Sequence, residues 1–177
     1  DYYFVDDNHL AFLIADVSGK GIPAAMFMMT AKTVIKSFVE SGFSVEEAFT
    51  FANAKLSEGN DAHMFVTAWM GVLDTKTGLV TFANAGHNAP LVKHADGTFE
   101  YFKSRAGFVL AGLEGVRYRK GELQLQKGDC IYLYTDGVTE AMNINEELYG
   151  DDRLRNTLNN IKEDNVAYKV VLDDAMD

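Results

Sequence analysis

The sequence contains little cysteine and proline, and it has fewer basic than acidic residues. Its 177 residues include one cysteine, Cys130, and 2 prolines, so an internal disulfide is excluded and a reducing compartment, the cytoplasm, is expected. Lys and Arg number 16 against 26 Asp and Glu, which gives a formal net charge of −10. Nucleic-acid binding needs clustered Lys and Arg, so this balance argues against it, whereas it suits a site that collects divalent cations.

Long hydrophobic runs are also absent. No run of about 18 apolar residues occurs, which argues against membrane contact, and residues 1–7 lack the basic start and apolar core of a signal peptide. The apolar share of 47% is typical of a globular protein, and at about 150 residues per domain the length predicts one domain. Because the chain opens without Met and stops inside a helical pattern, we expect a single domain over residues 1–177, truncated at both ends.

The hydrophobic pattern predicts two neighbouring helices between groups of strands. Pro23 is expected at the first position of the first helix and Gly42 at its end. Ser44 and Glu47 form a capping-box pattern, which predicts a second helix over residues 45–56. Further helical patterns begin near residues 151 and 166, and strands are expected at residues 10–15, 65–73, 79–83, 90–93, 98–102, 116–125 and 129–135. The short turns require antiparallel pairing, so the fold class is α+β in layers.

Two aspartates carry the strongest chemical signal. Asp16 and Asp136 each stand at the end of an apolar strand and are followed at once by a glycine-containing turn. A carboxylate in this position is held by a rigid strand, and Mg²⁺ and Mn²⁺ prefer oxygen ligands. A single Asp-Gly after a strand is usually only a turn, but two such segments in one chain favour a metal site. A phosphate-binding P-loop is excluded, because no glycine precedes Gly19-Lys20-Gly21 at the required spacing.

Four blocks of the sequence resemble, in order, the motifs of the SpoIIE-type bacterial serine/threonine phosphatases, members of the PPM (protein phosphatase 2C-like) family. The blocks are residues 16–25 (DVSGKGIPAA), 84–91 (NAGHNAPL), 134–141 (YTDGVTEA) and 149–154 (YGDDRL). The resemblance covers essentially the whole chain. It implies a four-layer α-β-β-α sandwich, in which two antiparallel sheets are flanked by helices and a pair of metal ions lies at one edge of the sheets.

The resemblance also implies a set of metal-binding residues. Asp16 would bridge two Mn²⁺ or Mg²⁺ ions, the backbone carbonyl of Val17 would bind one of them, and Asp136 would bind the other. Asp1 matches the last residue of the family's Gly-Gly-Asp opening and would act through a metal-bound water. Asp16 and Asp136 would be the catalytic residues. The two ions would activate a water molecule that attacks the phosphorus directly, without a covalent phosphoenzyme.

The activity implied is that of a metal-dependent hydrolase acting on phosphoserine or phosphothreonine. Its substrate would be a phosphorylated regulator in signal transduction, an anti-anti-sigma factor of sigma-factor regulation. Sensor or regulatory domains would accompany this domain in a larger, cytoplasmic protein. The oligomeric state is left open, a homodimer included, as are the activating signal and the preferred metal.

The sequence departs from the family pattern at two places. Phe4 stands where the family usually has a further Asp, and the family's last metal Asp, in an Asp-Asp-Ile-Thr-like strand, is not found. Asp173-Asp174 matches that motif only superficially, because it continues a helical apolar pattern, so we assign it to the last helix. The missing ligand keeps an alternative open: a catalytically weak or inactive phosphatase-like module that binds a regulatory protein.

Several further residues have both a structural and a functional interpretation. His87 could act in substrate binding or as a general acid, but its setting favours a turn in which polar side chains fix the backbone. Gly19 and Lys20 could contact a substrate phosphate. The methionine-rich segment 26–29 is interpreted as helix packing. Arg117, Arg119 and Lys120 form a small basic group, interpreted as a solvated strand edge rather than a docking site.

Overall fold

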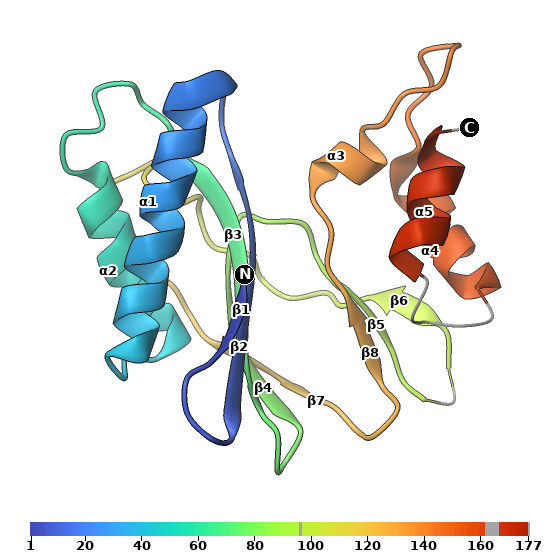
Figure 1. The fold of residues 1–177 in the computed structure, drawn as a ribbon, viewed down its shortest axis with the longest axis horizontal. Helices are drawn as coiled ribbons and strands as arrows, with labels where there is room; N and C mark the ends of the chain where they lie inside the picture. The colour runs from blue at the N-terminus through green and yellow to red at the C-terminus, as the bar shows by residue number, and fades with distance from the viewer. Residues whose placement is uncertain (96, 162–166, 177) are drawn as a thin grey trace. The chain divides into compact units, whose positions relative to one another are not determined.

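The structure is a computed structural model that describes residues 1–95, 97–161 and 167–176. Its chain forms two compact units, each with one sheet and its own helices (Figure 1). Unit 1 comprises Asp1–His87 and Ser104–Leu125, and unit 2 comprises Asn88–Lys103 and Gln126–Asp177. Both sheets are built from antiparallel strand pairs, which confirms the α+β fold class.

Unit 1 contains a five-stranded sheet with the strand order β1-β2-β3-β4-β7. The strands are β1 (Tyr2–Phe4), β2 (His9–Val17), β3 (Val66–Asp74), β4 (Leu79–Ala85) and β7 (Gly121–Gln124). Each pair of neighbours is antiparallel, so β2 and β4 run in the same direction and end at the same edge of the sheet. The strands predicted at residues 10–15, 65–73 and 79–83 are confirmed, and each is somewhat longer than predicted or displaced by one residue.

Two helices, α1 (Gly21–Glu40) and α2 (Val45–Ser57), cover one face of this sheet (Figure 1). The capping box is confirmed, because Glu47 Oε2 accepts hydrogen bonds from the Ser44 N–H at 3.0 Å and from its hydroxyl at 2.8 Å. Pro23 is the third helical residue rather than the first, a position that its missing N–H also tolerates. Gly42 follows the end of α1 with a φ of +88°, as expected for a helix-terminating glycine.

The alternation of side chains along β2 separates the two faces of the sheet. Ala11 and Leu13 are buried in the core formed with Ile35 of α1. On the opposite face, the ring of Trp69 stacks on Phe82 with centroids 5.4 Å apart, and Phe12 lies 5.5 Å from Trp69 on its other side. The face of unit 1 that lacks helices is therefore lined by aromatic rings.

Helix α1 is long and apolar enough, by length and composition, to cross a membrane. This is weak evidence, because the core helix of a soluble protein has the same properties. Four of its residues, Ala24, Ala31, Ile35 and Val39, are buried. At least part of its apolar character is therefore used in packing within unit 1.

Unit 2 contains a three-stranded sheet with the order β6-β5-β8. The elements are β5 (Leu91–Lys93), β6 (Phe99–Tyr101), β8 (Cys130–Tyr132), α3 (Asp136–Thr139), α4 (Gly150–Asn160) and α5 (Ala167–Met176). Leu154 and Leu158 of α4 pack with Leu91 and Phe99 of the sheet and with Val171 of α5. Asp173 and Asp174 lie within α5, so their assignment to a helix is confirmed. The predicted start of that helix at Val166 lies outside the described residues.

Four predicted strands are shorter than the sequence pattern indicated. The strands predicted over residues 90–93 and 98–102 are trimmed at their ends to β5 and β6, and the other two differ more. Residues 116–120 are not part of β7, because the N–H of Tyr118 donates to the hydroxyl of Thr50 in α2, at 3.2 Å, instead of extending the sheet. The strand predicted over residues 129–135 ends at Tyr132, and the one-turn helix α3 follows where a turn was expected.

Candidate functional site

Asp16 occupies the last position but one of β2, next to the end of the strand. It is paired with Thr67 of β3 and is half-buried, and its Oδ1 accepts a hydrogen bond from the N–H of Val17 at 2.8 Å. Ala15 and Val17 pack against the core under the helices. Because side chains alternate along a strand, Asp16 lies on the opposite face, the one lined by aromatic rings.

The backbone hydrogen bonds show where the carbonyl of Val17 points. The N–H of Ser18 donates to the carbonyl of Phe65 at 2.9 Å, so these two residues form a hydrogen-bonded pair. Val17 and Val66 are therefore the neighbouring non-hydrogen-bonded pair, and Val66 instead exchanges hydrogen bonds of 3.0 and 2.8 Å with Leu110. The Val17 carbonyl thus points away from β3, as the resemblance requires of a metal ligand beside Asp16.

The turn after Val17 leads directly into the N-terminus of α1. Gly19 and Gly21 have φ angles of +92° and +79°, a region that glycine adopts without strain. Lys20 precedes the helix in an extended conformation, is exposed and provides no side-chain cap. Uncapped N–H groups at a helix N-terminus attract anions, and the lysine charge adds to that attraction. This arrangement is consistent with a phosphate-binding role for Gly19 and Lys20, which stays a prediction.

Asp1 lies on the other face of the sheet from Asp16. It is paired with Leu13, since its backbone nitrogen donates to the Leu13 carbonyl at 2.8 Å and its carbonyl accepts from the Leu13 N–H at 2.8 Å. Leu13 packs on the helix side, and the carboxylate of Asp1 accordingly forms an ion pair with Lys32 of α1 at 3.1 Å. The structure therefore does not bring Asp1 and Asp16 to one face, and a metal role for Asp1 requires this ion pair to open.

His87 follows β4 and is 5% exposed. Its N–H donates to Asn84 Oδ1 at 2.8 Å, and Asn84 Nδ2 donates to the His87 carbonyl at 3.0 Å. These two hydrogen bonds confirm the turn fixed by polar side chains that the sequence predicts. The imidazole Nδ1 lies 2.9 Å from Thr67 Oγ1.

Thr67 was not identified from the sequence, yet it connects two predicted site residues. It lies directly opposite Asp16 in the β2–β3 pair, on the same face, and its hydroxyl is hydrogen-bonded to His87. The structure therefore brings Asp16 and His87 to the same part of unit 1, on either side of Thr67. Only the strand register reveals this link, because a threonine in a strand has no distinctive sequence signal.

Asp136, in unit 2, is the first residue of α3. Its side chain is exposed, and its carbonyl accepts a hydrogen bond from the N–H of Glu140 at 2.7 Å. The aspartate is thus carried by a single helical turn, preceded by residues 133–135 outside any strand. The convergence of Asp16 and Asp136 on one pair of ions stays a prediction.

The donor atoms of unit 1 suit a hard divalent cation. The carboxylate of Asp16 and the carbonyl of Val17 are both oxygen donors, which Mg²⁺ and Mn²⁺ prefer over nitrogen or sulfur. Within the described part of the chain, no group of three His, Cys, Asp or Glu side chains lies close enough to hold a metal ion. The chemistry of these donors therefore fits the implied ions, and a complete ligand set needs residues from elsewhere in the chain.

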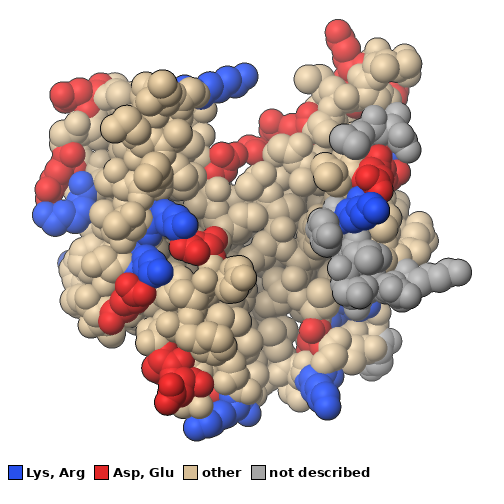
Figure 2. All heavy atoms as spheres, in the orientation of Figure 1, with Lys and Arg blue, Asp and Glu red and all other residues tan. Residues whose placement is uncertain are grey.

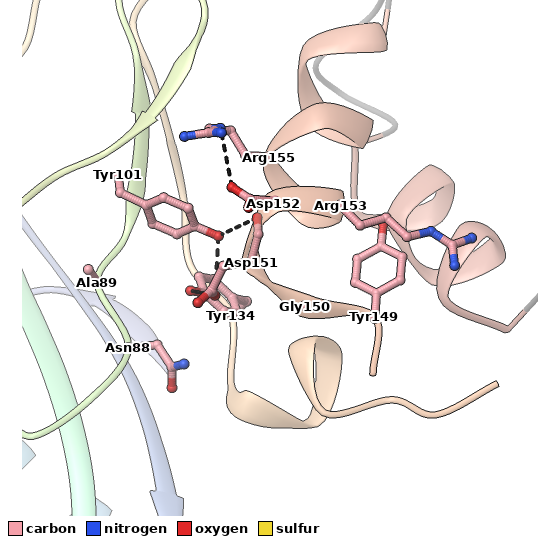
Figure 3. Close-up of a pocket in the computed structure, with 10 residues that line it drawn as sticks. All are labelled: Asn88, Ala89, Tyr101, Tyr134, Tyr149, Gly150, Asp151, Asp152, Arg153 and Arg155. Carbon is pink, nitrogen blue, oxygen red and sulfur yellow. Dashed lines mark hydrogen bonds and ion pairs between the residues drawn. The ribbon is translucent and has the colours of Figure 1, made fainter. Parts of the chain in front are cut away.

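Unit 2 has a polar pocket of about 650 Å³ beside the start of α4 (Figure 3). Tyr101 donates to the carbonyl of Asp151 at 2.9 Å, and Tyr134 donates to Asp151 Oδ1 at 3.3 Å. Asp152 pairs with Arg155 at 3.0 Å. Burial raises the pKa of Tyr101, so this hydroxyl remains a proton donor. The sequence identified the block at residues 149–154 and the block at residues 134–141, which begins with Tyr134, but it did not identify Tyr101.

The architecture of the chain is that of the PP2C-type phosphatase fold. The PP2C phosphatase domain of SpoIIE from Bacillus subtilis matches with a TM-score of 0.84 over 99% of this chain and 51% of that chain, at 16% identity. The family model of stage II sporulation protein E (SpoIIE) matches residues 6–175, so the chain belongs to this family.

Two relatives have higher sequence identity. Phosphoserine phosphatase RsbU of Bacillus subtilis (strain 168) is 35% identical over 142 residues, which are 79% of this chain and 42% of RsbU. The structure of the RsbU and RsbW domains of Rv1364c from Mycobacterium tuberculosis has 26% identity and a TM-score of 0.72, over 81% of this chain and 40% of that chain. The chain thus spans less than half the length of either relative.

Proposed function

We propose that this chain is a metal-dependent protein phosphatase that hydrolyses phosphoserine or phosphothreonine. The observation that carries the proposal is the end of β2, where the half-buried carboxylate of Asp16 lies beside the outward-pointing carbonyl of Val17. Both residues lie within the segment matched by the SpoIIE family model and within the block at residues 16–25 that resembles a family motif, which supports this assignment. The relative named phosphoserine phosphatase supports the same activity.

The residues of the chain have distinct roles in this proposal. Asp16 and Asp136 would hold two Mn²⁺ or Mg²⁺ ions with the help of the Val17 carbonyl, and Asp1 would take part through water once its ion pair with Lys32 opens. When bound, the ions supply the Lewis acidity that activates water and neutralises charge on the phosphoryl group. Lys20 and the free N–H groups at the start of α1 orient the phosphate. His87, fixed by Thr67 and Asn84, supports the turn beside the site.

The proposed substrate is a phosphorylated signalling regulator of the anti-anti-sigma type. Two comparisons support a regulatory role: the relative RsbU, and the protein in which an RsbU domain occurs with an RsbW domain. We place the protein in the cytoplasm, with regulatory domains in the longer polypeptide. A homodimer is compatible with this role.

The proposal is tested by measuring phosphate release from a phosphoserine protein with the full-length protein and increasing Mn²⁺. We expect turnover to depend on Mn²⁺, to stop in excess chelator, and to fall more than about 100-fold in both Asp16→Asn and Asp136→Asn. Loss of a residue that only hydrogen-bonds to a metal ligand reduces activity about 10–100-fold, and loss of a metal ligand itself should reduce it further. Asp173→Asn is the matched control, because Asp173 is an exposed aspartate in α5 and should leave turnover unchanged.

The two aspartate variants also separate the proposal from its alternative. If the wild-type protein binds Mn²⁺ and the phosphoprotein but releases no phosphate, the chain is a binding module. Unchanged turnover in Asp136→Asn, or turnover in excess chelator, would rule out the proposed metal chemistry.

A further inference from the structure

Unit 1 contains a polar cleft of about 240 Å³ beside the C-terminal end of β4. Its lining residues come from β4 and from two loop segments, and three of them are arginines: Asn84, Arg105, Ala106, Gly107, Arg117, Tyr118 and Arg119. The sequence had suggested that Arg117 and Arg119 belong to a solvated strand edge. The structure instead brings them together with Arg105, twelve residues earlier in the chain.

The three guanidinium groups are exposed and form no ion pair with any described residue. Lys120, next to them in the sequence, is different, because its ammonium lies 3.7 Å from Glu122. On the face that Figure 2 shows, Lys and Arg side chains mostly lie beside Asp and Glu side chains. The chain has a net charge of −10, but the three arginines, without an ion-pair partner in the described part of the chain, make the surroundings of this cleft positive. A positively charged cleft attracts anions.

The walls of the cleft are held by backbone and core contacts. Tyr118 is 6% exposed and packs edge-on against Phe49 of α2, with centroids 5.7 Å apart, so its neighbours Arg117 and Arg119 project from an anchored segment. On the other wall, the N–H of Gly107 donates to the carbonyl of Asn84 at 2.8 Å. A Cβ at Gly107 would lie 3.0 Å from that carbonyl oxygen and 3.0 Å from the Tyr118 ring, so a larger residue would require these neighbours to shift by a few tenths of an ångström.

The cleft is connected to the proposed metal site through a short chain of contacts within unit 1. Asn84 lies on the cleft and fixes the turn of His87, and His87 is hydrogen-bonded to Thr67, the partner of Asp16. Asn84 also shares the aromatic face of the sheet with Asp16, because it is paired with Trp69. The strands β2 and β4 are two strand spacings apart, which is about 10 Å.

We propose that this cleft binds an acidic segment of the phosphoprotein substrate, a few residues away from the phosphoserine. This inference rests on the proposed phosphatase function. An extended peptide advances about 3.3 Å per residue, so the distance to Asp16 corresponds to about three to five residues. Guanidinium groups match carboxylates in geometry and bind them with paired hydrogen bonds. The cleft therefore selects substrates by the acidic residues that flank the phosphoserine.

The test uses two phosphoserine peptides that carry either three Glu or three Gln at positions three to five residues from the phosphoserine. We expect the wild-type protein to have a KM about tenfold lower for the Glu peptide, with kcat unchanged. The double variant Arg117→Gln, Arg119→Gln should abolish this preference. Lys120→Gln, which removes a neighbouring charge outside the cleft, should keep it. Added KCl should weaken the preference, as expected for exposed charges.

Peptide binding, followed by fluorescence anisotropy in excess chelator, separates this proposal from the proposed function. Arginine-dependent preference for the Glu peptide in this assay, together with no turnover of either peptide when Mn²⁺ is supplied, supports the cleft and overturns the phosphatase activity. Equal turnover of both peptides overturns the cleft and leaves the activity standing. If inorganic phosphate displaces an unphosphorylated Glu peptide as well as a second Glu peptide does, the cleft is a simple phosphate site and peptide selection is overturned.

Discussion

The sheet of unit 1 and the helices of unit 2 are stabilised by different kinds of interaction. In unit 1, aromatic rings cover the face that lacks helices, and Phe82 lies directly opposite Gly121 of β7. This arrangement depends on close packing, because the space that a Cβ at Gly121 would occupy is already filled by the Phe82 ring.

In unit 2, a polar network connects α5 to α4. Asp174 of α5 accepts hydrogen bonds from Arg153 at 2.9 Å, from the Tyr149 hydroxyl at 2.7 Å and from the Thr157 hydroxyl at 2.6 Å. The guanidinium of Arg153 also lies over the Tyr149 ring, 4.8 Å from its centroid. The strength of these charged interactions depends on pH and salt concentration, whereas the packing of uncharged rings on the aromatic face does not.

The same contrast applies to the two proposed metal ligands. Asp16 is half-buried on a nine-residue strand with neighbours on both sides, whereas Asp136 is exposed on a single helical turn. Each proposed ligand is therefore held differently within its own unit. Changes to β2 and β3 should alter how Asp16 is held, and changes to α3 should alter how Asp136 is held.

The largest effect is expected from Gly121→Ala, which tests the packing of unit 1. The added Cβ would lie 2.3 Å from Cζ of Phe82, and the ring has no free space because it stacks on Trp69. Overpacking of this kind costs about 1–3 kcal/mol. We expect the free energy of unfolding, measured by urea denaturation, to fall by about this amount independently of pH.

Gly137→Ala in α3 of unit 2 is the matched control. A Cβ at Gly137 would meet only the Thr135 hydroxyl, at 3.5 Å. Alanine also has a higher helix propensity than glycine. The free energy of unfolding of Gly137→Ala should equal that of the wild-type protein or slightly exceed it. Equal destabilisation by the two substitutions would show that close packing does not distinguish the units.

A smaller, pH-dependent effect is expected from Asp174→Asn. Hydrogen bonds from Arg153, followed by those from Thr157 and Tyr149, lower the pKa of Asp174 to about 2 from an ordinary value of 3.8. A lowered pKa in the folded state stabilises the protein above the unfolded pKa, and this contribution is lost as the pH falls from about 4 to about 2. The side chain is 34% exposed, so we discount for solvent screening and expect a loss of about 1 kcal/mol at pH 7.

Urea denaturation between pH 7 and pH 2 measures this contribution. The difference between the wild-type protein and Asp174→Asn should shrink below pH 4 and vanish near pH 2, while Asp173→Asn should differ little from wild type at any pH. A difference that persists at pH 2 would mean that Asp174 acts through its shape rather than its charge.

The sequence was informative wherever structure depends on neighbouring residues. The capping box at Ser44 and Glu47 predicted the start of α2 correctly, and the local pattern placed Asp16 correctly near the end of a strand. The same pattern was wrong for Asp136, which begins α3 after β8 has ended at Tyr132. The prediction failed at Tyr118, whose backbone bonds to Thr50, a partner 68 residues away that no local pattern reveals.

The site residues that the sequence missed also depend on distant pairing. Thr67 became significant only because the register places it opposite Asp16, and the arginine cleft exists because Arg105 folds back beside Arg117. The face on which Asp1 lies follows from its pairing with Leu13, which the sequence resemblance does not encode. Register and loop packing are properties of the whole fold, so they could not be predicted from the motifs.

The smallest effect is expected from Lys32→Gln, which tests whether the carboxylate of Asp1 can leave the helix-covered face of unit 1 for the face of Asp16. Lys32 holds the carboxylate of Asp1 on the helix side at 3.1 Å, and it competes with any cation that needs this carboxylate near Asp16. Because an exposed ion pair is weak, its removal should raise the Mn²⁺ affinity only about twofold, measured by calorimetric titration. Lys36→Gln is the control, since Lys36 pairs with Glu40 at 3.6 Å on the same helix and should leave the affinity unchanged. Identical Mn²⁺ affinities in Lys32→Gln and wild type would show that Asp1 stays on the helix face and takes no part in binding the metal.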